Sequence, residues 1–155
     1  MTSRADALAP RRRRFSDRLA KVEAAASSTD PHAFPDAVAG GLDALYDLWE
    51  FWSKVAGLNM RSEDAAVSGD ADGEVAAALV HARGSKSHAL VEFGDLTNTY
   101  AERYYDHYGC WRWQAHTDPR FPRRDRWYRM HVANQEVSTP LAAAARWLRA
   151  RQELI

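Results

Sequence analysis

The chain has 155 residues, 46% of them hydrophobic and 27% charged, so it can bury one core and is neither a disordered nor a fibrous protein. No apolar run reaches the roughly 18 residues that a membrane span needs, and the basic N-terminal stretch lacks the apolar segment of a secretory signal. Because the single cysteine, Cys110, cannot form an internal disulfide, we expect a reducing, cytoplasmic location.

The formal net charge is zero, but the charges are unevenly distributed along the chain. Residues 1–29 carry seven basic and three acidic side chains, residues 30–78 carry two and ten, and residues 79–155 carry twelve and eight. The three segments therefore have net charges of +4, −8 and +4. Such segments can attract one another within one chain or between chains, or present a basic face to a polyanion.

Helical spacing of apolar residues dominates the sequence and predicts an all-α fold, a single bundle of five or six helices. We expect residues 1–30 to form a basic N-terminal arm or helix and residues 31–155 to form the bundle domain. The first helix should begin at Pro10 and end before the turn-forming residues 27–31. Its apolar face consists of Phe15, Leu19, Val22 and Ala26.

Four consecutive arginines lie at the start of this first helix. They form either an exposed, solvating arm or an arm that binds phosphate groups. The second interpretation predicts salt-dependent binding of RNA or DNA. The four residues are Arg11, Arg12, Arg13 and Arg14.

A second helix should begin after Pro35, with Asp36 in its first turn, and end at Gly57. Gly40 and Gly41 inside this helix indicate a close approach of another helix. The helix carries a broad apolar stripe, which is typical of a core or a dimer interface. The stripe consists of Leu42, Leu45, Tyr46, Leu48, Trp49, Trp52 and Val55.

The aromatic residues of this stripe predict association with another chain. Trp49, Phe51 and Trp52 spread apolar surface over more than one face of the helix, so we expect a homodimer. A different protein that contacts Trp49 and Trp52 is a further candidate partner.

The middle of the chain alternates between acidic and alanine-rich segments. Residues 61–73 predict a mobile acidic loop, residues 74–84 a third helix, and residues 88–93 either a continuation of that helix or a short strand. The third helix places Val75, Leu79 and Ala82 on one face.

The last third of the chain is rich in aromatic and basic residues. Residues 97–109 predict a helix, residues 109–123 an irregular segment, and residues 124–133 a helix with Trp127, Met130 and His131 on one side. A final helix should have Thr139 as its N-cap and Pro140 at its first position.

One motif suggests chemistry: Arg83, four intervening residues and His88, at the end of the alanine-rich helix. This Arg-x4-His spacing resembles the motif of the HEPN superfamily, whose members are small all-α domains. Many of them are dimeric, metal-independent endoribonucleases of toxin or defence systems. The resemblance implies that His88 acts as general base or acid and that Arg83 holds the phosphate, with the two motifs of a dimer facing one cleft.

Other interpretations of the histidines and arginines remain open. Arg83 and His88 can be a helix-capping arginine and a polar helix-end histidine without a catalytic role. His131 also fits the family's range of four to six intervening residues, with four after Arg126 and six after Arg124, and we expect this second motif to be dispensable for chemistry. His81 lies seven residues before His88 and could share its face.

Further side chains are candidates for phosphate or nucleic-acid contacts. Lys86 lies within the motif, and Arg112 lies between Trp111 and Trp113, where rings and guanidinium groups could stack on bases. A zinc site is a weaker alternative, since its spacing matches no known module, and the sequence predicts neither a metal nor a cofactor. That alternative site would use His107, Cys110 and His116.

Two functions from different classes therefore stand at the level of the sequence. The first is a metal-independent endoribonuclease, with Arg83 and His88 as its catalytic pair. The second is a non-catalytic helical interaction module or regulatory subunit, which could bind nucleic acid through its basic ends.

Overall fold

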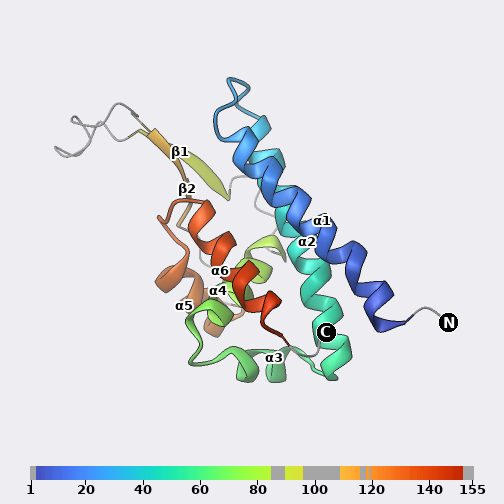
Figure 1. The fold of residues 1–155 in the computed structure, drawn as a ribbon. Helices are drawn as coiled ribbons and strands as arrows, with labels where there is room; N and C mark the ends of the chain where they lie inside the picture. Colours follow the sequence, from blue (N-terminus) through green and yellow to red (C-terminus); the bar gives the residue numbers. More distant parts are fainter. Residues whose placement is uncertain (1–2, 85–89, 96–108, 116–117, 119, 152–155) are drawn as a thin grey trace.

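The computed structural model describes residues 3–84, 90–95, 109–115, 118 and 120–151 (Figure 1). Within these ranges the fold consists of six helices and one small antiparallel sheet, which confirms the predicted all-α class. None of the described helices is both long and apolar enough to span a bilayer. The elements are α1 (Arg4–Ala25), α2 (Ala33–Ala56), α3 (Met60–Val67), α4 (Ala71–Gly84), β1 (Val91–Asp95), β2 (Gly109–Trp113), α5 (Pro122–His131) and α6 (Ser138–Arg149).

Helices α1 and α2 form a long antiparallel pair beside the other helices (Figure 1). Buried Leu8, Phe15 and Val22 place α1 in the same core as the rest of the chain. Gly40 permits the predicted close approach of two helices, because a Cβ atom there would lie 3.2 Å from Nη1 of Arg18. The basic N-terminal segment is thus a packed helix of the bundle.

The start of α1 differs from the prediction. Pro10 lies inside the helix, which begins at Arg4 because Ser3 and Asp6 form a capping box. The start of α2 also lies earlier than predicted, at Ala33. Pro35 fits there because the first turn of a helix has amide hydrogens without intrahelical partners. The predicted end of α2 is confirmed, since Gly57 adopts the left-handed conformation with φ of 69°.

Helix α4 is the centre of the bundle and packs against α2, α5 and α6. The sequence predicted one buried face, but the helix is buried on all sides, and its many alanines allow neighbouring helices to approach closely. The buried residues are Gly73, Val75, Ala76, Ala77, Ala78, Leu79, Val80, His81 and Ala82.

The tryptophans of α2 lie in the core rather than on a partner surface. Trp49 and Trp52 are each 2% exposed, and Trp147 of α6 covers both, with ring centroids 5.5 and 4.8 Å away. The prediction that a partner binds through Trp49 and Trp52 is therefore wrong, because a distant segment of the same chain occupies that surface. The homodimer stays a prediction, without this support.

The acidic segment 61–73 is not a loop. Residues 60–67 form α3, which begins with a capping box between Asn59 and Ser62, and α4 starts at Ala71. Val67 of α3 is fully buried. Two of its acidic side chains, Glu63 and Asp64, are held by a distant arginine, as described below.

Two strands occupy segments that the sequence left ambiguous or irregular. β1 and β2 pair in antiparallel register, with Val91 opposite Trp113 and Asp95 opposite Gly109. Fully buried Trp113 anchors the sheet, since its indole Nε1 donates to the carbonyl of Val137 at 3.2 Å. Of the segment predicted to be irregular, residues 109–113 therefore form β2 and residues 122–123 begin α5. The predicted helix over 97–109 lies outside the described residues, apart from Gly109 in β2.

The two C-terminal helices confirm the prediction, with shifted details. In α5, Trp127 faces inward as expected, but Met130 is exposed and Tyr128 is buried instead. Helix α6 begins at Ser138 without a side-chain cap, so Thr139 is not the N-cap and Pro140 lies within the first turn.

Candidate functional site

The predicted catalytic arginine lies in the last turn of the central helix. Arg83 is in α4, two residues after buried His81. His88 and Lys86 lie outside the described residues, so the Arg83–His88 pairing stays a prediction.

Two residues of α2 hold the Arg83 side chain. Its Nε donates to Oδ1 of Asp43 at 3.0 Å, and its guanidinium carbon lies 4.2 Å from the centroid of the Tyr46 ring. The side chain remains 39% exposed, and its two Nη groups donate to none of the described residues. Arg83 is therefore oriented by the protein while the four N–H donors of its Nη groups have no partner among the described residues, an arrangement suited to an anion.

Arg83 borders a pocket of about 340 Å³, hereafter the α4-end pocket. It lies where the end of α4 meets α2, α3 and the segment that leads into α5. Its polar lining comes mainly from α4 and from that segment. The lining residues are Tyr46, Met60, Val80, His81, Arg83, Gly84, Asp118, Arg120, Phe121 and Arg124.

A second guanidinium belongs to this pocket. Nε and Nη2 of Arg120 donate to the two carboxylate oxygens of Asp118 at 2.9 and 2.8 Å. These hydrogen bonds lower the pKa of Asp118 to about 2 and raise the pKa of Arg120. Arg120 stays largely exposed, so a second permanent positive charge lies at the pocket.

His81 lies in the wall of the α4-end pocket. It is buried, and its ring centroid lies 5.6 Å from that of Phe121. Positive charge on His81 also contributes to the lowered pKa of Asp118. The pocket therefore combines an imidazole, a carboxylate and three guanidinium groups, of which that of Arg124 is buried in ion pairs. These are the residue types that bind and protonate phosphate oxygens.

The alternative pairs around His131 have structural roles. Arg124 is 5% exposed and donates to Asp64 Oδ1 at 2.7 Å and to Glu63 Oε1 at 3.0 Å. His131 Nε2 lies 2.9 Å from Oε1 of Glu74 on α4. Burial raises the pKa of Glu74, but hydrogen bonds from Gly69 and His131 outweigh it and lower the pKa overall.

The four arginines of α1 do not act as one group. Nη1 of Arg11 donates to the carbonyl of Ala7 at 2.7 Å, its Nε lies 3.3 Å from Asp47, and it stacks on Phe51. This arginine fixes α1 on α2. The other three are exposed and contact no charged or hydrogen-bonding partner in the described part of the chain; they are Arg12, Arg13 and Arg14.

The stacking surface predicted around Arg112 is only partly available. Nη1 of Arg112 donates to the carbonyl of Asn134 at 2.9 Å, which ties β2 to the segment before α6. Trp113 and Trp127 are buried, and Trp111 stacks on Phe34 with centroids 4.7 Å apart. Base stacking on Trp113 is therefore excluded because the chain buries it, whereas Trp111 is only partly covered and the phosphate contact of Arg112 stays a prediction.

Sequence reasoning missed Asp43, Asp118 and Arg120. The Asp118–Arg120 pair sits in a proline-rich stretch, and an aspartate two residues before an arginine was its only local signal. Among the described residues no three His, Cys, Asp or Glu side chains gather into a metal site, and the His107–Cys110–His116 alternative lies largely outside them. Comparison with family models, curated proteins and solved structures finds no match to this chain.

Proposed function

We propose that this protein is a metal-independent endoribonuclease in which Arg83 binds the scissile phosphate and His88 transfers protons. The observation that carries the proposal is the state of Arg83. Asp43 and Tyr46 orient its guanidinium, its Nη groups have no partner among the described residues, and Arg120, paired with Asp118, brings a second exposed guanidinium to the same pocket.

The reaction needs no group besides these side chains. The ribose 2′-oxygen attacks the adjacent phosphorus while a base accepts its proton, and the bond from phosphorus to the 5′-oxygen breaks as that oxygen accepts a proton. The products are a 2′,3′-cyclic phosphate and a 5′-hydroxyl. Arg83 would stabilise the extra negative charge on the phosphate oxygens, and a histidine suits the proton transfers because it titrates near neutral pH.

The motif resemblance adds a partner to the proposal. In the HEPN superfamily the two motifs of a dimer face one cleft, so we expect the ends of two α4 helices to meet in a homodimer. Sedimentation at micromolar concentration tests this step. If the protein is a monomer and still cleaves RNA, the proposed chemistry stands and the proposed dimer is rejected. A role in a toxin or defence system belongs to the same proposal.

The direct test is cleavage of labelled single-stranded RNA by purified protein in excess chelator. We expect products with cyclic phosphate ends and a loss of about 100-fold or more in rate for His88→Ala. His131→Ala is the control, because His131 pairs with Glu74 away from the α4-end pocket. Absence of cleavage, or dependence on His131 rather than His88, would reject the nuclease.

A second candidate function, nucleic-acid binding without catalysis, is favoured by the exposed arginines of α1. Arg13 and Arg14 have no partner in the described part of the chain and can contact phosphates. Replacing both with glutamine should weaken RNA binding and lower its salt dependence, whereas Arg146→Gln on α6 should not. An unchanged salt slope would assign these arginines to solubility alone.

A further inference from the structure

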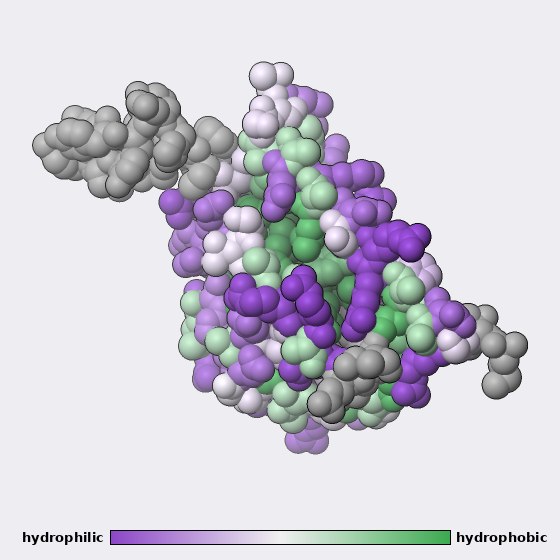
Figure 2. Space-filling model, viewed as in Figure 1, coloured by the Kyte–Doolittle hydropathy of each residue, from purple (hydrophilic) through white to green (hydrophobic). Residues whose placement is uncertain are grey.

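A groove on the other side of the bundle is independent of the proposed nuclease site. Helix α1 packs on α2 and α6 packs on α4, and the two outer helices barely touch each other. Between them lies a groove of about 250 Å³. Figure 2 shows a hydrophobic hollow bordered by hydrophilic side chains on this face. We call it the α1–α6 groove; its lining residues are Arg12, Phe15, Ser16, Leu19, Leu48, Ala145, Leu148 and Arg149.

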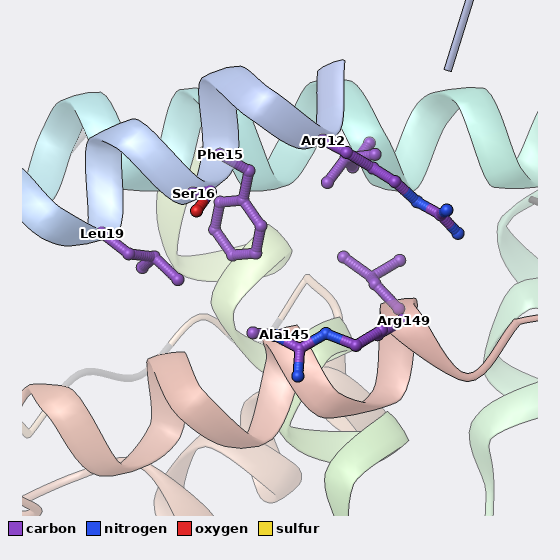
Figure 3. Close-up of a pocket in the computed structure, with 8 residues that line it drawn as sticks. Arg12, Phe15, Ser16, Leu19, Ala145 and Arg149 are labelled. Carbon is purple, nitrogen blue, oxygen red and sulfur yellow. The ribbon is translucent and has the colours of Figure 1, made fainter. Parts of the chain in front are cut away.

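The groove has an apolar floor and a cationic rim. Phe15 and Leu19 come from α1, Leu48 lies beneath on α2, and Leu148 comes from α6. Arg12 and Arg149 come from opposite walls, as Figure 3 shows. Neither arginine contacts a carboxylate or other polar partner within the described ranges, in contrast to Arg11 and Arg146 nearby, which pair with aspartates.

This combination selects an amphiphilic anion. The apolar floor favours a hydrocarbon chain, and two guanidinium groups on the rim favour a carboxylate, which they can bind with bidentate hydrogen bonds. Size then limits the ligand. A cavity of about 150 Å³ holds benzene with its six heavy atoms, so about 250 Å³ holds roughly ten. A protein helix would need far more area, since stable interfaces bury roughly 1,200 Å² or more.

We propose that the α1–α6 groove binds a medium-chain carboxylate of about eight carbons, with its chain along the apolar floor and its head group at the cationic rim that Arg12 and Arg149 form. Octanoate has ten heavy atoms and fills the groove. Carboxylates with more than about ten carbons would extend into solvent, so their additional carbons add little affinity.

Calorimetric titration with fatty acids below their micelle concentrations tests this assignment. A fully buried methylene improves affinity about fourfold, and in this open groove we expect about twofold per carbon from hexanoate to octanoate. The gain should level off by about ten carbons, and octanol should bind about fivefold more weakly than octanoate. A steady gain with chain length, or equal binding of octanol, would overturn the assignment in favour of nonspecific adsorption.

Matched variants locate the site. Arg12→Gln and Arg149→Gln should each weaken octanoate binding about fivefold. Arg146→Gln, one turn away on α6 and paired with Asp72, should leave it unchanged. Ala145→Phe fills the groove and should abolish binding, whereas Ala142→Phe on the exposed side of α6 should not.

Melting curves confirm that each variant is folded. Unchanged binding by folded Arg12→Gln and Ala145→Phe variants would overturn the proposal. The proposal is also rejected if octanoate does not bind and Ala145→Phe changes the oligomeric state. That result would mean that a second copy of the chain occupies the groove. RNA cleavage should be unaffected by octanoate, so failure here leaves the proposed nuclease untouched.

Discussion

Replacing Arg124 should cost more stability than replacing any exposed arginine. Its side chain is 5% exposed and forms ion pairs with both Glu63 and Asp64, whose side chains are 12% and 14% exposed. Glu63 also accepts a hydrogen bond from Nε1 of Trp49 at 3.0 Å, so the network joins α5 and α3 to the core of α2. Arg124→Ala leaves two adjacent carboxylates with little water and no counter-charge.

Removing one partner of a buried ion pair costs about 3–5 kcal/mol. Because both carboxylates retain some exposure, we expect the lower end, about 3 kcal/mol. For a chain of 155 residues this corresponds to a fall in Tm of about 6–12 °C. Arg146→Ala is the control, since its pair with Asp72 is exposed and its loss should shift Tm little.

A charge-neutral variant separates lost charge compensation from lost packing. Arg124→Met with Glu63→Gln and Asp64→Asn removes all three charges, and the Glu63→Gln change keeps a side-chain oxygen that can accept the hydrogen bond from Trp49. This triple variant should regain most of the stability that Arg124→Ala loses, as measured by thermal and urea unfolding. The reasoning is refuted if Arg124→Ala melts within about 2 °C of the wild type, or if the triple variant is no more stable than the single one.

Two further predictions concern packing and pH. Gly73→Ala should lower the free energy of unfolding by about 1–3 kcal/mol, because the added Cβ would lie 2.7 Å from Nε1 of Trp147. Gly84→Ala is the control and should be neutral or slightly stabilising, because the space around Gly84 is open. Equal urea midpoints for the two variants would contradict this difference. The pKa of Asp118 falls from 3.8 to about 2 on folding, so its carboxylate stabilises the fold above pH 3.8 and this contribution disappears as pH falls towards 2. Asp118→Asn should therefore lower Tm at pH 7 and match the wild type near pH 2, and a Tm difference independent of pH would exclude this role.

The helices were predictable wherever a local pattern determines them. The apolar stripe of α2, its glycine cap and the amphipathic α6 each follow from residues within one or two turns. Helix α3 was not predictable, because its acidic residues gain their partner from Arg124, about sixty residues away. For the same reason the sequence left β1 open between helix and strand and missed β2, since the two strands are well separated in sequence.

In the candidate site, too, the local sequence predicts some features and distant segments determine the others. The position of Arg83 at an exposed helix end followed from the motif and the helical pattern. Asp43 and the Asp118–Arg120 pair come from other parts of the chain, and only folding brings them beside Arg83. The burial of Trp49 by Trp147 likewise depends on how α2 and α6 are arranged, which periodicity alone does not determine.

The most direct test of the proposed function compares two exposed arginines that each pair with an aspartate. Arg83 and Arg146 each pair through Nε with an exposed aspartate, Asp43 and Asp72, but only Arg83 lies at the α4-end pocket. The measurement is the single-turnover rate of RNA cleavage in excess chelator. We predict a loss of about 100-fold or more for Arg83→Ala and an unchanged rate for Arg146→Ala. Equal rates for the two folded variants would contradict the assignment of Arg83 as the phosphate-binding residue.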